Sequence, residues 1–113
     1  MVRKNLEIFR NTSKVYELRF KRQGMNNDIT GWTIYFTVKE NMIDTDVNAK
    51  IKKDITTHPD GKHGIALIEI SSSETDLPEK AYYYDIKFKD ENDNVGILFS
   101  GRLEIKKPVT LRI

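Results

Sequence analysis

Apolar and polar residues alternate along most of the chain, and a period of two is typical of β-strands that bury one face. The clearest example is the segment 28–41, DITGWTIYFTVKEN, in which Trp32, Ile34, Phe36 and Val38 are apolar and their neighbours are mostly polar. Its β-branched and aromatic residues are those that pleated, half-covered surfaces favour. Helical spacing is nearly absent, so the pattern predicts an all-β protein.

The same alternation predicts seven strands in all, and one of them has the composition of an edge strand. The lysines of the segment 48–55 would deter unwanted pairing there. In the last strand, Ile97, Phe99, Leu103 and Ile105 are expected to face inward, with Gly101 at a bulge. The predicted strands cover residues 6–8, 16–21, 32–39, 48–55, 65–70, 81–90 and 95–107.

Turn signals separate these strands at intervals of roughly 8–12 residues, a spacing typical of β-sandwiches. Glycine, proline or asparagine clusters mark turns at 22–28, 57–64 and 90–94. The segment 71–80 starts with serines and acidic residues, and Pro78 limits it to about one helical turn. We therefore expect residues 1–113 to form one antiparallel, immunoglobulin-like β-sandwich of seven to eight strands with one short helical crossover. A small barrel is the alternative.

Trp32 stands at the start of the strongest predicted strand, where a large aromatic ring suits the interior of a sandwich. We expect it to be the core aromatic residue. Its replacement by alanine would then cost about 3–5 kcal/mol of stability through lost burial and a residual cavity.

The charge balance narrows the classes of partner. The chain carries 19 Lys and Arg against 17 Asp and Glu, a formal net charge of +2, with the two signs mixed along the sequence. This composition does not favour a nucleic-acid partner. No segment approaches the ~20 apolar residues of a membrane span or has the form of a signal peptide, so neither is expected. The chain has no cysteine, which excludes disulfides, thiolate metal sites and a cysteine nucleophile.

Two polar clusters have the composition of metal sites. His58, Asp60 and His63 could together bind zinc, but they lie on a Pro-Asp-Gly turn where polar residues are common anyway. The turn is the favoured interpretation.

The second cluster, Asp90, Asn92 and Asn94, imitates the first ligands of a calcium loop. Val95 and Gly101 then occupy the positions where the template requires glycine and glutamate, so a solvated hairpin tip is favoured. Serine-hydrolase, zinc-protease, Walker and dinucleotide-binding motifs are also absent from the sequence. We predict a protein without cofactor or catalytic residues.

The candidate contact residues lie on predicted sheet faces and in the C-terminal segment. Tyr35 and Tyr83 alternate with inward residues, so they should project from outer faces, where tyrosines anchor protein contacts or stack on sugars. Cross-strand packing is the simpler interpretation. After Pro108, the segment 108–113 presents Val109, Leu111 and Ile113 at alternate positions. It can add to another subunit's sheet as an exchanged strand or fold back as the last strand of its own domain.

Four segments resemble, in order and spacing, small proteins of tailed phages and prophages that are similar to the N-terminal domain of phage upper baseplate proteins. The likeness covers roughly residues 14 to 110, and Glu79-Lys80 departs from the glycine that commonly precedes the tyrosines. The segments are DITGWTIYFTVK at 28–39, AKIKK at 49–53, LPEKAYYYDI at 77–86, and GRLEI at 101–105 followed by Val109-Thr110.

This resemblance implies a virion structural or adaptor protein, assembled in the host cytoplasm, that binds other phage tail or baseplate proteins and forms homo-oligomers. The resemblance implies no catalytic residues in this chain. The alternative function is a glycan-binding or adhesion module in which Tyr35 and Tyr83 form a sugar platform.

Overall fold

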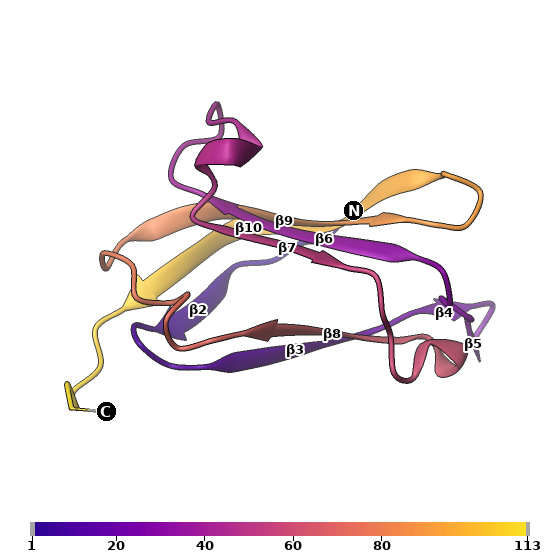
Figure 1. Ribbon diagram of the computed structural model, residues 1–113, viewed down its shortest axis with the longest axis horizontal. Coiled ribbons are helices and arrows are strands. Elements are labelled where there is room, and N and C mark those ends of the chain that lie inside the picture. Colours follow the sequence, from indigo (N-terminus) through magenta and orange to yellow (C-terminus); the bar gives the residue numbers. More distant parts are fainter. Residues whose placement is uncertain (1, 113) are drawn as a thin grey trace.

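The computed structural model describes residues 2–112, which fold into two layers of β-sheet joined by turns (Figure 1). Two short 3₁₀ turns are the only helical pieces among these residues. The strands are β1 (Val2–Arg3), β2 (Leu6–Phe9), β3 (Lys14–Arg19), β4 (Lys21–Arg22), β5 (Met25–Asn26), β6 (Thr33–Lys39), β7 (Ile51–Ile55), β8 (Ile65–Ile70), β9 (Ala81–Lys89) and β10 (Val95–Lys106), and the 3₁₀ turns are η1 (Asp46–Asn48) and η2 (Gly61–His63).

The larger layer has the strand order β1-β10-β9-β6-β7, with β2 also paired to β10. The smaller layer consists of β3 and β8, and β4 and β5 form a separate two-stranded hairpin. Figure 1 shows β3 and β8 lying beneath the larger sheet. All pairs are antiparallel except those of β1 and β2 with β10, which are parallel. The all-β expectation is therefore confirmed, but the larger sheet is mixed and not purely antiparallel.

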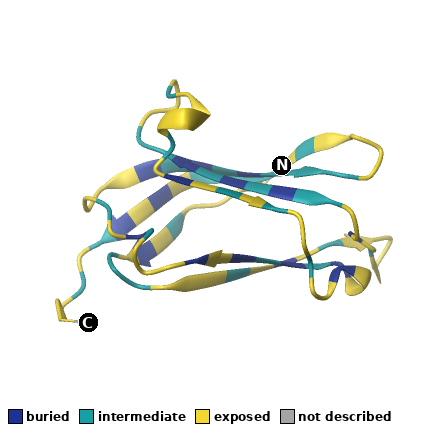
Figure 2. Cartoon of the chain, in the orientation of Figure 1, coloured by how far each residue is buried: buried dark blue, intermediate teal, exposed yellow. Residues whose placement is uncertain are grey.

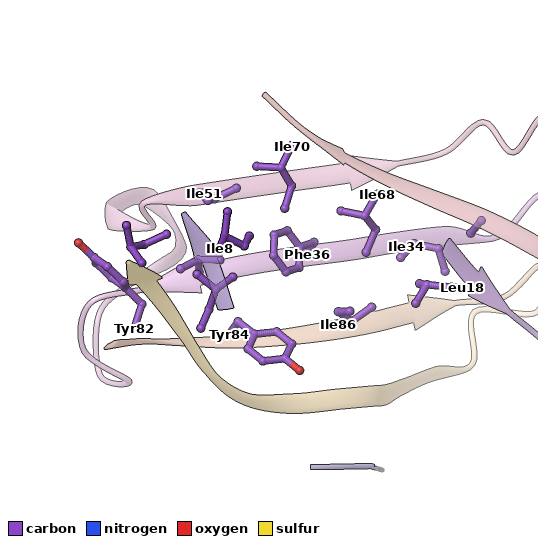
Figure 3. Packing of buried hydrophobic residues seen from close by; sticks show 14 of the residues in the cluster. Ile8, Leu18, Ile34, Phe36, Ile51, Ile68, Ile70, Tyr82, Tyr84 and Ile86 are labelled. Carbon is purple, nitrogen blue, oxygen red and sulfur yellow. The ribbon is translucent and has the colours of Figure 1, made fainter. Parts of the chain in front are cut away.

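The core lies between the two layers and is built from the inward positions of every major strand. Ile34, Phe36 and Val38 of β6 have no exposed surface, as the alternation predicts. Figure 3 shows Phe36 between Ile68 and Ile70 of β8 on one side and Tyr84 of β9 on the other. In Figure 2, buried and less buried positions alternate along the strands of the larger sheet.

β1 and β2 both pair with β10, and residues 4–5, which separate the two strands, are also hydrogen-bonded to β10. The backbone nitrogen of Lys4 donates to the carbonyl of Ser100, and that of Arg102 donates to the side-chain oxygen of Asn5, 3.1 Å away. A Cβ atom at Gly101 would overlap the Lys4 carbonyl, so glycine is required there by close approach of the two backbones. The chain thereby keeps one register from β1 to β2, since Val2 pairs with Phe99 and Leu6 with Leu103.

The bulge in β10 lies at Leu98 and not at Gly101. Pairing with β9 shifts between Ile97 and Phe99, so one extra residue is inserted there. Because the side-chain period is two, the inserted residue moves the side chains that precede it in β10 to the opposite face of the sheet. Ile97 is therefore 39% exposed, whereas Leu98 and Phe99 pack against the core. The prediction was wrong for Ile97 and correct for Phe99, Leu103 and Ile105.

The segment 71–80 crosses from β8 of the smaller layer to β9 of the larger one, as expected, but the helical turn predicted there was wrong, because the segment forms turns without a helix. The Glu74 carboxylate accepts from the Ser71 backbone nitrogen at 2.9 Å, as in a helix-capping box. Thr75 then turns into the core, where its hydroxyl donates to the Thr12 carbonyl. The segment thus begins like a helix and leaves that path after one turn.

Trp32 precedes β6 and is only partly buried, so it does not form the centre of the core. Its ring stacks on Phe88 with centroids 5.2 Å apart and meets the edge of Phe20 at 5.4 Å. Its Nε1 donates a hydrogen bond of 2.6 Å to the carboxylate of Glu91, which lies in the β9–β10 turn. Trp32 therefore closes one end of the core.

Residues 107–112 form no strand and extend away from the sheets toward the side of the smaller layer (Figure 1). Val109 and Leu111 are exposed, and Ile113 lies outside the described residues. The expectation that this segment folds back as the domain's own last strand is not met. The edge position predicted for the lysine-rich strand is confirmed, since β7 ends the larger sheet.

Candidate binding face

The outer face of the larger sheet, which points away from β3 and β8, is hollowed into a trough of about 1080 Å³. Its floor comes from β6, β9 and β10, and its wall at one end comes from the segment 40–50. The residues that line the trough include Tyr35, Thr37, Lys39, Tyr83, Asp85, Lys87, Ile97 and Arg102 on the floor, Met42 and Asp46 on the wall, and Arg3, Lys52, Asp54 and Lys89.

Strand register fixes the positions of the two predicted contact tyrosines on this floor. Thr37 pairs with Asp85 at the centre, whereas Tyr35 pairs with Lys87 on one side and Tyr83 with Lys39 on the other. Tyr35 and Lys39 are four residues apart on β6, so the tyrosines are separated by about 13 Å along the strands. The structure therefore brings Tyr35 and Tyr83 to one face, at opposite sides of a central carboxylate.

This arrangement shifts the pKa of Asp85, at the centre of the floor. Burial raises the pKa of its carboxyl, and the positive charges of Lys87 and Lys39 partly offset that shift. Asp46 adds to the rise through its negative charge, although Lys39 binds Asp46 directly at 2.8 Å. The floor of the trough thus holds a carboxyl that is less acidic than an ordinary aspartate.

The trough carries more positive than negative charge. Arg3, Lys52 and Lys87 form no ion pair within 4.0 Å among the described residues. The guanidinium of Arg102 lies over the Tyr83 ring, 5.4 Å from its centroid. The trough is therefore suited to contact with acidic or aromatic groups of another molecule. Its cationic residues are Arg3, Lys39, Lys52, Lys87, Lys89 and Arg102, and its acidic residues are Asp46, Asp54 and Asp85.

The wall segment, residues 40–50, adds an apolar prominence that the sequence analysis missed. Met42, Ile43 and Val47 are 73%, 94% and 90% exposed. Figure 1 shows this segment, with η1, standing above the larger sheet, and Figure 2 shows most of it as exposed. The base of the loop is fixed, because Glu40 forms a hydrogen-bonded ion pair with Lys80. A usable signal was present: ENMIDTDVN has apolar residues between turn formers but no alternation to bury them.

The polar clusters considered as metal sites are occupied by local contacts. His58 Nε2 lies 2.8 Å from the Trp32 carbonyl oxygen, and His63 Nδ1 lies 2.5 Å from the Asp60 carboxylate. Asp90 accepts hydrogen bonds from the backbone nitrogens of Asn92 and Asn94 within its own turn. Over residues 2–112 no three His, Asp or Glu side chains gather as metal ligands.

The remaining predicted contact residues, Val109 and Leu111, lie apart from the trough. The C-terminal segment that carries them runs from the end of β10 toward the side of the smaller layer (Figure 1), and no residue of this segment lines the trough. Within the described residues no helix is long and apolar enough to cross a membrane. No protein-family model matches the chain, and no curated protein is significantly similar to it.

Proposed function

We propose that this chain is a non-enzymatic, immunoglobulin-like assembly module of a tailed phage or prophage. It binds other tail or baseplate proteins and works by contact alone. The observation that carries the proposal is the trough, where Tyr35 and Tyr83 flank a charged floor beside the exposed apolar loop at 40–50. Half-exposed tyrosines, arginine and protruding apolar residues are the groups that protein interfaces concentrate.

The strand order supports the immunoglobulin-like assignment. In variable-type immunoglobulin domains the strands G, F, C and C′ form one sheet, and B and E pair in the other. Here β10, β9, β6 and β7 follow the first order, and β3 and β8 occupy the places of B and E.

A side-chain contact at the start of β9 agrees with this assignment. The Tyr82 hydroxyl donates to the Pro78 carbonyl oxygen at 2.7 Å, four residues upstream. A tyrosine near the start of strand F that bonds back to the preceding backbone is the tyrosine corner of immunoglobulin-like domains. Tyr84, two residues later, stands where antibody domains carry their second cysteine.

The phage context is supported by the segments that resemble small tail and baseplate proteins. DITGWTIYFTVK covers β6, and LPEKAYYYDI covers the tyrosine corner and the first half of β9. These two segments supply the trough with Tyr35 and Tyr83. The proposed location is the virion, after assembly in the host cytoplasm.

The experiment is the isolation of particles from a host that produces this protein. Mass spectrometry of gradient-purified virions should detect the chain in a fixed ratio to known tail proteins. Its absence from intact particles would overturn the proposal. The Tyr35→Ala, Tyr83→Ala double variant should fold normally yet be depleted from particles. Phe9→Ala, an exposed aromatic residue outside the trough, is the matched control and should be incorporated normally.

One observation favours glycan binding as a second candidate. Tyr35 and Tyr83 line the trough on either side of Thr37 and Asp85, whose oxygens can bond sugar hydroxyls. A glycan array probed with the folded protein tests this. Binding that the Tyr83→Ala variant loses would support it, and an array without signal would remove it.

A further inference from the structure

The smaller layer contains only two strands, and within residues 2–112 no further strand pairs with the outer edge of either. Open edges offer unpaired backbone groups to another strand, and proteins usually protect them with charges. The β3 edge is protected in this way, because Glu17 and Arg19 form an ion pair on it at 3.4 Å. The edge strand β7 carries Lys52, Lys53 and Asp54. The β8 strand, IALIEI, has one charge, on Glu69.

Backbone pairing shows which groups of β8 point outward. Phe20 donates to the Gly64 carbonyl at 2.7 Å, so Phe20 and Gly64 form a hydrogen-bonded pair. In an antiparallel ladder such pairs alternate, so Ala66, Ile68 and Ile70 bond to β3 in the same way. The backbone groups of Leu67 and Glu69 consequently face the open edge. Asp60 covers only the first position, where its carbonyl accepts from Ile65.

Residues 109–112 have the features of a strand that lacks a partner. Val109 and Leu111 alternate with Thr110 and Arg112, and both apolar side chains are exposed, Val109 fully. A strand added to β8 with Val109 and Leu111 facing the core would place Arg112 on the outer face with Glu69. The charges on this face would then be complementary. On β3 the outer residues Glu17 and Arg19 already pair with one another.

We infer that the open edge of β8 receives residues 109–112 of a second copy of this chain as an added strand. This inference rests on the proposed assembly role and names the partner at this edge. Main-chain hydrogen bonds to Leu67 and Glu69 hold the strand, and the Arg112–Glu69 charge pair favours β8 over β3. Each copy donates one segment and accepts another, so the contact closes as a reciprocal dimer or extends into larger assemblies.

Cysteine cross-linking tests the placement directly, because the natural chain contains no cysteine. Two single variants, Glu69→Cys and Thr110→Cys, carry different affinity tags and are mixed under mild oxidation. The first variant lacks the Glu69 charge, so the mixture is kept at high protein concentration, where the main-chain hydrogen bonds hold the strand. Neighbouring residues on one face of paired strands bring their Cβ atoms within about 5.5 Å, close enough for a disulfide after small shifts. We expect a mixed-tag dimer in this mixture, or with Leu67→Cys if the register differs by two residues.

The matched control replaces Glu69→Cys with Glu17→Cys, an equally placed exposed glutamate on β3. Cross-linking to Thr110→Cys should fall several-fold. Equal yields from Glu17 and Glu69, or no mixed dimer from any pair, would overturn the inference. A monomeric cross-link within one Glu69→Cys, Thr110→Cys chain at low concentration would also overturn it, because the segment would then pair with its own β8.

Charge reversal provides an independent reading by light scattering over a concentration series. Glu69→Lys should weaken self-association several-fold, whereas Glu17→Lys should leave it unchanged. A chain ending at Lys107 should remain monomeric, and a dimer that survives this deletion would contradict the inference. These measurements use the isolated protein, so their failure leaves the virion test of the trough unaffected. Loss of trough binding in the Tyr35→Ala, Tyr83→Ala variant would likewise leave strand addition intact.

Discussion

The Tyr84 hydroxyl donates a 2.5 Å hydrogen bond to the carbonyl oxygen of Lys4, eighty residues earlier in the chain. This bond fixes the N-terminal segment at its interruption, where the pairing of β1 and β2 with β10 has no regular ladder. Gly101, the residue paired with Tyr84, leaves room for the Lys4 backbone to approach. The Tyr84 hydroxyl and the absence of a side chain at Gly101 together keep residues 2–9 close to β10.

Tyr84→Phe should lower the free energy of unfolding by about 1 kcal/mol, because it removes one hydrogen bond and leaves the ring in place. Amide hydrogen exchange should accelerate in residues 2–9 more than elsewhere. Denaturant titration and exchange mass spectrometry measure the two effects. Tyr83→Phe, on the trough side of the same strand, is the control. Equal exchange rates in the two variants would show that Tyr84 does not anchor this segment.

Gly101→Ala should cost about 1–3 kcal/mol, since the new methyl group would overlap the Lys4 carbonyl and force the two backbones apart. The accelerated exchange should again concentrate in residues 2–9. Gly24→Ala is a useful comparison, because its φ of +79° makes alanine strained while the space around it is open. That variant should lose stability without loosening residues 2–9. The same exchange pattern in both variants would argue against backbone overlap at Gly101.

Trp32→Ala should cost about 2 kcal/mol, less than the ~3–5 kcal/mol expected for Phe36→Ala. Phe36 is fully buried, whereas Trp32 retains exposed surface and loses mainly its contacts with Phe88 and Phe20. Thermal and denaturant unfolding followed by circular dichroism give both values. If Trp32→Ala proved the more damaging variant, Trp32 would be the central core residue that the sequence pattern suggests.

Asp85→Asn should stabilise the protein at neutral pH. Burial raises the folded-state pKa of Asp85 above its ordinary value, so the folded protein binds this proton more tightly than the unfolded chain. Stability from this group is therefore present at pH values below the ordinary aspartate pKa. It is lost as pH rises through the raised pKa. Asparagine cannot ionise and avoids this loss.

The measurement is a melting-temperature profile from acidic to neutral pH for both proteins. The advantage of Asp85→Asn should be present at neutral pH and disappear in acid. Asp54→Asn removes a negative charge from the same trough and controls for the change in net charge. An Asp85→Asn variant that is less stable at neutral pH would show that attraction to Lys39 and Lys87 outweighs burial.

Alternation in the sequence was sufficient to place the seven longer strands and most of their faces, but not the two-residue strands β1, β4 and β5. Tyr82, Tyr84 and Ile86 of β9 are buried as predicted, and Tyr35 and Tyr83 lie on an outer face. These assignments succeed because a period of two is imposed by the pleat of every strand. The period carries no information about an inserted residue, so the bulge at Leu98 reversed the assignment of Ile97.

The alternation of apolar and polar residues did not indicate which strands pair with one another or what shape the loops take. Nothing in the spacing of Leu6 and Ile8 indicates that their strand runs parallel to β10, because parallel and antiparallel strands alternate alike. The shape of the trough was equally hidden, since it depends on where the segment 40–50 stands relative to β9. Sequence reasoning identified the two tyrosines but could not see Met42, Ile43 and Val47 beside them.

The parallel pairing of residues 2–9 with β10 also sets the order of events during synthesis. While the ribosome is still making the middle of the chain, this first segment has no strand to pair with, because β10 spans residues 95–106. Its apolar residues Leu6 and Ile8 therefore stay exposed to solvent until residues 95–106 have left the ribosome. Closure of the larger sheet is consequently a late, long-range step, and the nascent chain is most open to aggregation just before it.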